Sequence, residues 1–291
     1  MTIATRGLVK RYGDHVALDR VDLAVSPGMV YGLVGANGAG KTTLLSILAG
    51  LRRPTSGSVH VEADRSQVAV LPDAPRFEPW LTGREVVSLA AHLAGRGRAR
   101  IDEVLAGAGL ADAASRRVGG YSRGMLQRLG IAATVVPEPR VLLLDEPAAA
   151  LDPGGRRDVL DLVRRLRGEA TVVFSSHILA DVQEVSDWVG ILDRGRLLFQ
   201  GPVADLLVHH AAPTYLVTVR LGLAEAEGAL RRCPWVHRRD RLDDRTLRVR
   251  VASLEEAEAG WAAALAGSGA RVVSVRPQAL TLEDVFLEVT R

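Results

Sequence analysis

Cysteine and lysine are scarce in this sequence of 291 residues, which holds one cysteine and two lysines among its 37 basic residues. The single cysteine, Cys233, excludes an internal disulfide and a cysteine-based zinc site, and it suits a reducing cytoplasm. We expect it to be an inert thiol. No apolar run reaches the roughly 20 residues that a membrane-spanning helix needs. The amino-terminal MTIATRGLVKRYG also lacks the apolar core of a signal peptide.

The charge balance gives no reason to expect a nucleic-acid surface. The formal net charge is +3, and the hydrophobic and charged fractions, 47% and 24%, are those of an ordinary globular protein. The stretch RRDRLDDRTLRVR at 238–250 is basic, but acids interrupt it and it alternates like an exposed strand. We therefore expect a solvated face there in preference to a phosphate-binding one, and no nucleic-acid partner.

Arginine supplies 35 of the basic residues, which leaves lysine at positions 10 and 41. In a chain with this bias, a remaining lysine marks a site that a guanidinium does not fit, because an ammonium is a compact point charge. Lys10, in VKRYG, is compatible with chance. Lys41 follows a glycine-rich loop, so it is the stronger candidate for a functional lysine.

The segment MVYGLVGANGAGKTTLLSILAGL at 29–51 has the pattern of a phosphate-binding loop. An apolar strand leads into G-x-x-x-x-G-K-T and then into a helix, the context that this motif requires. The glycines let backbone N–H groups surround a β-phosphate, Lys41 bridges the β- and γ-phosphates, Thr42 holds Mg²⁺ and Thr43 reaches the α-phosphate. A glycine turn before a core helix is the alternative, which the order of all four parts disfavours. The predicted nucleotide-binding residues are Gly35, Ala36, Asn37, Gly38, Ala39, Gly40, Lys41, Thr42 and Thr43, and the predicted helix anchors are Leu44, Leu45, Ile47, Leu48 and Leu51.

Two acids follow a second buried-looking strand. The run from Val141 to Leu144 is continuously apolar, as inside parallel sheets, and Asp145 and Glu146 come directly after it. At that sheet edge Asp145 would face the magnesium shell, and Glu146 would polarise the attacking water as general base. Two acids capping a turn are the alternative for this segment alone. The next strand, in TVVFSSH, places His177 at the same edge, where we expect it to contact the γ-phosphate.

The stretch GGYSRGMLQR at 119–128 reads as a glycine-rich loop that enters a helix. Ser122 is a good N-cap, so the first turn presents free backbone N–H groups and the positive end of a helix dipole. Such a helix start attracts an anion, which could belong to this chain or to another one.

Together these segments resemble the ATP-binding cassette of ABC transporters, over roughly residues 3–210. Residues 35–43 match its Walker A motif, 141–146 its Walker B motif and 149–152 its D-loop, which contains Asp152. His177 is similar to the switch histidine, and Tyr12 resembles the aromatic residue that stacks on adenine. The stretch 119–128 matches the signature motif between the two Walker motifs.

The resemblance implies which anion binds at the start of this helix and which chain holds it. In this family the signature helix points at the γ-phosphate of ATP held by the opposite subunit, so Ser122 would donate its hydroxyl and Gly124 its N–H. One chain would then hold two half-sites. Two cassettes must meet head to tail with two ATP molecules between them, as a homodimer or as a pair with a homologous cassette. ATP and Mg²⁺ are the implied ligands.

The signature departs from the usual L-S-G-G-Q at two positions. Arg123 stands for the first glycine and Met125 for the glutamine. The resulting Y-S-R-G-M resembles the Y-S-K-G-M form of a bacterial branch that serves ABC-2 type export permeases. Ser122 and Gly124, the implied phosphate donors, are retained.

The Q-loop departs further, because Asp73 replaces the expected glutamine, which ligates Mg²⁺ in the family. Aspartate is shorter by one methylene and charged, so it could bind the metal directly or through water, or perturb catalysis. We hypothesise that Asp73 keeps the metal role, beside Thr42 and Asp145. Phe77 and Trp80 follow it, either as core of a helical subdomain or as a groove for a short helix of a membrane subunit.

We expect an α/β fold, a P-loop NTPase of the ABC cassette type with a RecA-like core. Residues 1–210 would form this domain, with an antiparallel β subdomain and a helical signature subdomain at about 78–136. After VHHAAPT, a predicted linker, the pattern resets into a small α+β domain at 213–291 that ends in a helix capped by Thr281 and Asp284. A similar extension is common in the same exporter branch. We expect a dimerisation or regulatory surface, with stabilisation of the cassette as the alternative.

The predicted function is the ATP-hydrolysing subunit of an ABC transporter that drives export through a separate ABC-2 type permease. The chain would then be cytoplasmic and peripheral on the inner face of the cell membrane. A soluble ABC ATPase acting on ribosomes or DNA is the alternative, although such proteins carry two cassettes or long coiled coils. A cassette that binds ATP without hydrolysing it is a third possibility, which Glu146 and His177 disfavour.

Overall fold

The computed structural model describes residues 1–149, 151–209, 213–278 and 281–289. They form two compact units, Met1–Val203 and Ala204–Glu288. The first unit ends seven residues before the expected boundary at 210, since helix α7, Val203–His209, lies almost wholly in the second. The VHHAAPT segment, 208–214, was expected as a linker, but its first two residues are the last two of α7. Its residues 210–212 lie outside the described part.

The first unit is built on a six-stranded sheet of order β10-β9-β4-β8-β7-β6. Strands β9, β4, β8, β7 and β6 are parallel, and β10 pairs antiparallel with β9 through a turn at Gly195. Strands β4, β7 and β8 are buried on both faces. Accordingly β4 and β7 are almost continuously apolar, and β8 is apolar at its centre, residues 172–174. The bounds are β4 Val30–Val34, β6 Val68–Leu71, β7 Val141–Leu144, β8 Thr171–Ser176, β9 Trp188–Asp193 and β10 Arg196–Pro202.

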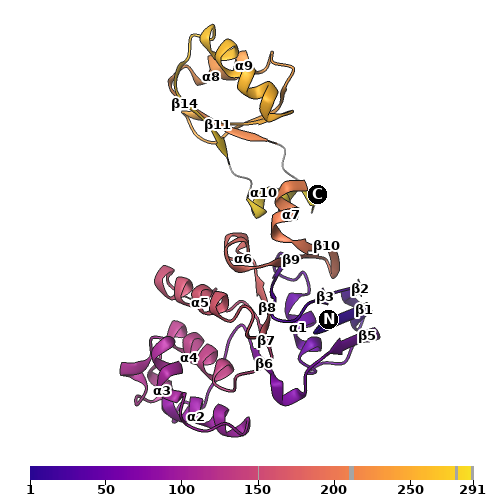
Figure 1. Ribbon diagram of the computed structural model, residues 1–291, viewed down its shortest axis with the longest axis vertical. Coiled ribbons are helices and arrows are strands. Elements are labelled where there is room, and N and C mark those ends of the chain that lie inside the picture. The colour runs from indigo at the N-terminus through magenta and orange to yellow at the C-terminus, as the bar shows by residue number, and fades with distance from the viewer. Residues whose placement is uncertain (150, 210–212, 279–280, 290–291) are drawn as a thin grey trace. The chain divides into compact units, whose positions relative to one another are not determined.

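A second, antiparallel sheet carries the amino-terminal segment of this unit. Strand β1 pairs with β2, β3 and β5. Its apolar side chains share one core with the first helix and the six-stranded sheet. Figure 1 shows the antiparallel sheet beside this helix, α1. The bounds are β1 Ile3–Tyr12, β2 His15–Val21, β3 Ala24–Val25 and β5 Ser56–Val61.

Helix α1, Lys41–Leu48, follows the glycine-rich loop and packs into this core. Four of its predicted anchors are confirmed, since Leu44, Leu45, Ile47 and Leu48 are at most 3% exposed. The prediction for Leu51 is wrong, because the helix ends before it, the chain turns at Gly50, and the Leu51 side chain is 70% exposed.

Three helices form the expected helical subdomain next to the β6 edge of the sheet (Figure 1). Helix α2, Gly83–Leu93, begins with a capping box in which Thr82 and Glu85 exchange hydrogen bonds. The bonds from Thr82 hold the pKa of the Glu85 carboxyl below its usual value. Helices α3, Ile101–Gly107, and α4, Arg123–Val135, share a separate apolar core with α2. The subdomain is thus a packed body of its own.

Two further helices cover the six-stranded sheet, α5 Pro153–Arg165 and α6 Leu179–Val185. As predicted, Asp152 caps α5 by accepting a hydrogen bond from Gly155 N at 2.9 Å, with Pro153 at the first helical position. Arg156 of α5 binds Asp181 of α6, its Nε lying 2.7 Å from Oδ1. Burial raises the pKa of Asp181 above its usual value, while the Arg156 bond opposes this shift. The pair ties the two helices together.

The second unit is an α+β domain, as expected, with the order β11-α8-β12-β13-α9-β14. Its antiparallel sheet has the strand order β12-β13-β11-β14, which is the ferredoxin-like arrangement. The basic stretch 238–250 is not one exposed strand but a hairpin, in which Leu247, Val249 and Val251 face the core. Thr281 and Asp284 form the predicted cap of α10. The bounds are β11 Thr214–Leu221, α8 Leu223–Leu230, β12 Val236–Arg241, β13 Thr246–Val251, α9 Leu254–Ala266, β14 Arg271–Gln278 and α10 Leu282–Val289.

No helix in the described part of the chain has the length and apolar character to cross a bilayer.

Candidate nucleotide-binding site

The strand order explains how distant segments meet at one edge of the six-stranded sheet. Strands β4, β8, β7 and β6 are neighbours and parallel, so their carboxyl ends lie at the same edge. The glycine-rich loop follows β4, His177 follows β8, Asp145 and Glu146 follow β7, and Asp73 comes shortly after β6. Four predicted site segments are therefore brought together by topology alone.

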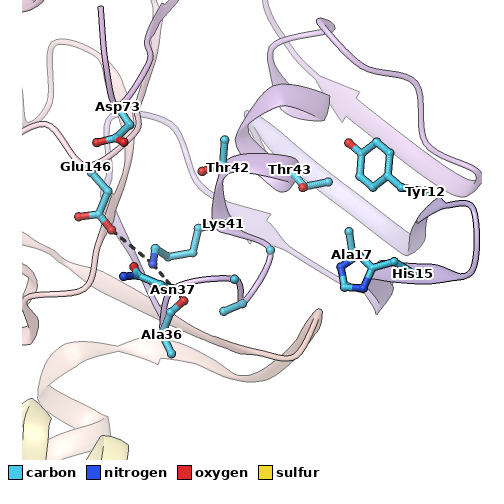
Figure 2. A pocket seen from close by; sticks show the side chains of 13 residues that line it. Tyr12, His15, Ala17, Ala36, Asn37, Lys41, Thr42, Thr43, Asp73 and Glu146 are labelled. Carbon is cyan, nitrogen blue, oxygen red and sulfur yellow. Dashed lines mark hydrogen bonds and ion pairs between the residues drawn. The ribbon is translucent and has the colours of Figure 1, made fainter.

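A cavity of about 340 Å³ lies between this edge and the antiparallel sheet (Figure 2). It receives side chains from the glycine-rich loop, from β1 and β2, and from the loops after β6 and β7. Of the described residues, those that line it are Tyr12, His15, Ala17, Ala36, Asn37, Gly38, Ala39, Gly40, Lys41, Thr42, Thr43, Asp73 and Glu146.

The glycine-rich loop needs glycine at two positions for different physical reasons. Gly40, the residue that precedes α1, has φ +109°, which side chains rarely adopt, and a Cβ there would lie 2.6 Å from the Ala17 carbonyl oxygen. Gly35 has no unusual φ, but a Cβ there would lie 2.3 Å from the carbonyl oxygen of Leu192. These two glycines are therefore required by close backbone packing against β2 and β9 as well as by the curvature of the loop.

Three of the predicted site residues are in direct contact. Glu146 Oε1 lies 3.3 Å from Lys41 Nζ, and Glu146 Oε2 lies 2.8 Å from His177 Nδ1. Lys41 Nζ also donates to the Gly35 carbonyl at 2.7 Å, and Figure 2 shows its side chain reaching from α1 toward Glu146. The Glu146 side chain is only 13% exposed, so its charge interaction with Lys41 is stronger than it would be at an open surface.

Asp145 and Glu146 differ in their surroundings although they are adjacent. Asp145 is buried and accepts a hydrogen bond from Ser175 Oγ at 2.6 Å, and the same Oγ accepts one from Glu146 N at 2.8 Å. Glu146 has φ +47°, an uncommon value outside glycine, so the backbone turns sharply where its carboxylate meets the cavity. Asp145 does not itself line the cavity; it lies behind Glu146 and is held by β8.

The signature stretch lies elsewhere on the first unit. Ser122 is the predicted N-cap of α4, accepting a hydrogen bond from Met125 N at 3.3 Å. Ser122 and Arg123 are exposed, Gly124 and Met125 are half-buried, and none of the four lines the described cavity. The structure thus leaves the tip of α4 accessible and separate from the cavity of its own chain.

Helix α4 also contacts the segment after Glu146. The buried Gln127 donates from Nε2 to the Pro147 carbonyl at 3.2 Å, and Arg128 lies 3.7 Å from Asp152. Two consecutive side chains of α4 therefore contact the segment 147–152, which includes the D-loop.

Several residues at the site were not predicted from the sequence. His15 and Ala17 line the cavity from β2, Ser175 joins the two acids, and Gln127 holds the turn after Glu146. Ser175 lies within the SSH of the predicted strand end, and His15 is opposite Tyr12 in the hairpin. The proximity of Ser175 to His177 and of His15 to Tyr12 in the sequence could have identified both residues. Gln127 could not have been identified in this way, because its role depends on how α4 packs.

A glycine-rich loop between β4 and α1, a carboxylate pair after β7 and a parallel sheet with this strand order define a P-loop nucleoside triphosphatase. Residues 18–149 match the family described as ABC transporter. The ABC transporter ATP-binding protein YxlF of Bacillus subtilis (strain 168) is 38% identical, across 80% of this chain and 81% of its own length. The daunorubicin resistance ATP-binding protein DrrA3 of Streptomyces coeruleorubidus is 36% identical, across 99% of this chain and 95% of its own.

A solved structure of the ATP-binding cassette MJ0796, a dimeric post-hydrolysis state bound to ADP and Pi, is similar with a TM-score of 0.64. It is 25% identical, and the alignment covers 69% of this chain and 98% of that one. The chain belongs to the ABC transporter family, as an ATP-binding and ATP-hydrolysing subunit. Nothing in these comparisons favours the alternative of a ribosome- or DNA-acting ATPase.

Proposed function

We propose that two cassettes close head to tail around two ATP molecules, and that hydrolysis lets them part, with this cycle driving export through a separate permease. The observation that carries the proposal is the separation within one chain of the cavity around Lys41 and Glu146 from the exposed, serine-capped tip of α4. A helix start with free N–H groups binds phosphate, so a second chain can supply what the cavity lacks. The MJ0796 cassette, which is dimeric in a post-hydrolysis state with ADP and Pi, supports pairing of two cassettes.

The residues of the cavity divide the chemical work. The backbone of residues 35–40 and the Lys41 ammonium bind the phosphates, and Glu146 orients and deprotonates the attacking water. His177, 2.8 Å from Glu146, holds that carboxylate, and we assign to it the contact with the γ-phosphate. Tyr12, exposed on the cavity wall, offers its ring to the adenine. Ser122 and Gly124 complete the γ-phosphate site of the other chain, next to the D-loop at Asp152.

The donor set fits Mg²⁺, which takes few protein ligands together with substrate phosphates and water. Thr42 and Asp73 line the cavity, and Asp145 is the buried carboxylate behind Glu146. In the described residues no group of three or more His, Cys, Asp and Glu side chains is placed to hold a metal alone. When bound, Mg²⁺ would neutralise charge on the β- and γ-phosphate oxygens.

The proposed partner is an integral-membrane permease of the ABC-2 type, which places the chain at the cytoplasmic face of the membrane. DrrA3, a daunorubicin resistance protein, spans nearly the same length, which supports export of a drug-like molecule. The test is affinity purification of the tagged chain from membranes of its own source. We expect a polytopic membrane protein to copurify and to increase ATP turnover. Recovery of ribosomal subunits without a membrane protein would replace the proposal by the soluble alternative.

Asp73 tests the metal assignment. Because its carboxylate lines the cavity, we expect Asp73→Asn to raise the Mg²⁺ concentration for half-maximal turnover and to lower turnover about ten-fold. Asp73 is exposed, so the melting temperature should not change. Asp73→Gln, which introduces the family's usual residue, is the matched variant and should recover most activity. Unchanged magnesium dependence and turnover in Asp73→Asn would remove Asp73 from the metal site.

Phe77 and Trp80, predicted from sequence as one pair with two possible roles, are separated by the structure. Phe77 packs against the core of the helical subdomain, whereas Trp80 is 64% exposed. We expect Trp80→Ala to abolish permease-coupled transport while basal ATP hydrolysis and stability stay unchanged, because an exposed side chain contributes little to folding. Phe77→Ala is the control and should lower stability by about 2 kcal/mol. An equal loss of transport and hydrolysis in Trp80→Ala would contradict a docking role.

A further inference from the structure

Lys10, one of the two lysines in the chain, lies against the ring of Tyr12. Its Nζ is 4.9 Å from the centre of the Tyr12 ring, within the range of a cation–π interaction. The guanidinium carbon of Arg52 lies 5.6 Å from the same ring centre. Two positive charges therefore contact one exposed aromatic side chain.

Lys10 is fixed by the segment that follows α1, which also carries Arg52. Lys10 Nζ donates to the carbonyl oxygen of Arg53 at 2.9 Å. The neighbouring backbone is held as well, because Thr55 N donates to the Val9 carbonyl at 2.8 Å and Thr55 Oγ1 accepts from Arg11 N at 3.0 Å. The end of the phosphate-loop helix is thus connected to the strand that carries Tyr12.

The cations do not occupy the cavity. Tyr12 lines it and is 40% exposed, whereas neither Lys10 nor Arg52 is among the described residues that line it. The ring is therefore contacted by cations outside the cavity and still borders the space inside it, with Thr43 and His15 nearby (Figure 2). Such a ring is restrained before a ligand arrives, which lowers the entropy cost of stacking.

We propose that Lys10 is a positioning residue for the nucleobase, acting through the Tyr12 ring. This inference rests on the proposed function, in which Tyr12 stacks on the base. It gives a role to one of the two lysines in a chain whose other 35 basic residues are arginine. The Lys10 ammonium reaches the Arg53 carbonyl and the Tyr12 ring at the same time, so one hydrogen bond holds the charge against the ring.

The test compares ATP with inorganic tripolyphosphate, which has the phosphates but no base. Lys10→Met keeps the aliphatic stem and removes the charge. We expect it to weaken ATP binding and raise KM about two- to five-fold, the size of an exposed cation–π contact, with kcat unchanged. The affinity for tripolyphosphate, measured by competition, should not change. Arg11→Met removes the same charge from the next residue and should leave both affinities unchanged.

A double-mutant cycle with Tyr12→Ala shows whether Lys10 acts on ATP binding through the Tyr12 ring. In the Tyr12→Ala background, Lys10→Met should have no further effect on ATP binding. An equal effect with and without the ring, or equal weakening of tripolyphosphate, would overturn the inference while Tyr12 keeps its role. If Tyr12→Ala itself left ATP binding unchanged, the base assignment in the proposed function would fail instead. Lys10→Gln is the second variant, and melting temperatures check that each variant folds.

Discussion

Glu146→Gln should reduce ATP turnover by about 10²- to 10⁴-fold, the range that general-base catalysis contributes. The substitution keeps the size of the side chain and its contact with His177, but an amide cannot accept the proton of the attacking water. The ion pair with Lys41, at 3.3 Å, would also be lost, which leaves the ammonium free for phosphate. ATP affinity should therefore be kept or increased while turnover disappears.

The same variant should trap the closed pair of cassettes. If ATP holds two chains together and hydrolysis separates them, a chain that binds without hydrolysing remains paired. Light scattering after addition of Mg²⁺ and ATP should show a dimer for Glu146→Gln and a monomer without nucleotide. Glu184→Gln, an exposed carboxylate on α6, is the matched control and should turn over normally. A monomeric Glu146→Gln chain with full turnover would contradict both parts of the proposal.

The local motifs were readable from the sequence because each is contiguous. The strand, glycine loop and helix around Lys41 lie within a short stretch, and so do the strand and acids at 141–146. The shared sheet edge of the two acids and His177 was predicted as well, but the order of the strands was not. The strand before His177 lies between β4 and β7, although β7 precedes it in the chain. That order alone brings His177 to 2.8 Å from Glu146.

The errors have physical causes at particular residues. The apolar spacing of Leu51 suits a helix face, but α1 ends before it, so the side chain is exposed. The basic stretch 238–250 resembles one exposed strand in sequence, but its Asp243 and Asp244 lie in the turn of a hairpin. Phe77 and Trp80 are equally aromatic in sequence, and only tertiary packing separates a core residue from an exposed one. Ser175 was missed because its role depends on Asp145, which is 30 residues away.

The division of the site between two chains leads to the second large effect, at Ser122. Ser122→Asp should lower turnover about 100-fold or more, because a carboxylate replaces a phosphate donor and repels the γ-phosphate. Aspartate is as good an N-cap as serine, so α4 should keep its start and the chain its melting temperature. Ser122→Asn, an uncharged cap, should lose less activity.

Mixing variants then shows whether the signature acts on its own chain or on the other. Lys41→Ala and Ser122→Asp chains should each be inactive alone, since every pocket of either homodimer contains a defect. In a mixed dimer one pocket collects both defects and the other has none. Random pairing makes half of the dimers mixed, so turnover should recover to about one quarter of the wild-type value if each intact pocket works independently. A signature that served its own chain would place one defect in every pocket of every dimer, and mixing would then recover nothing.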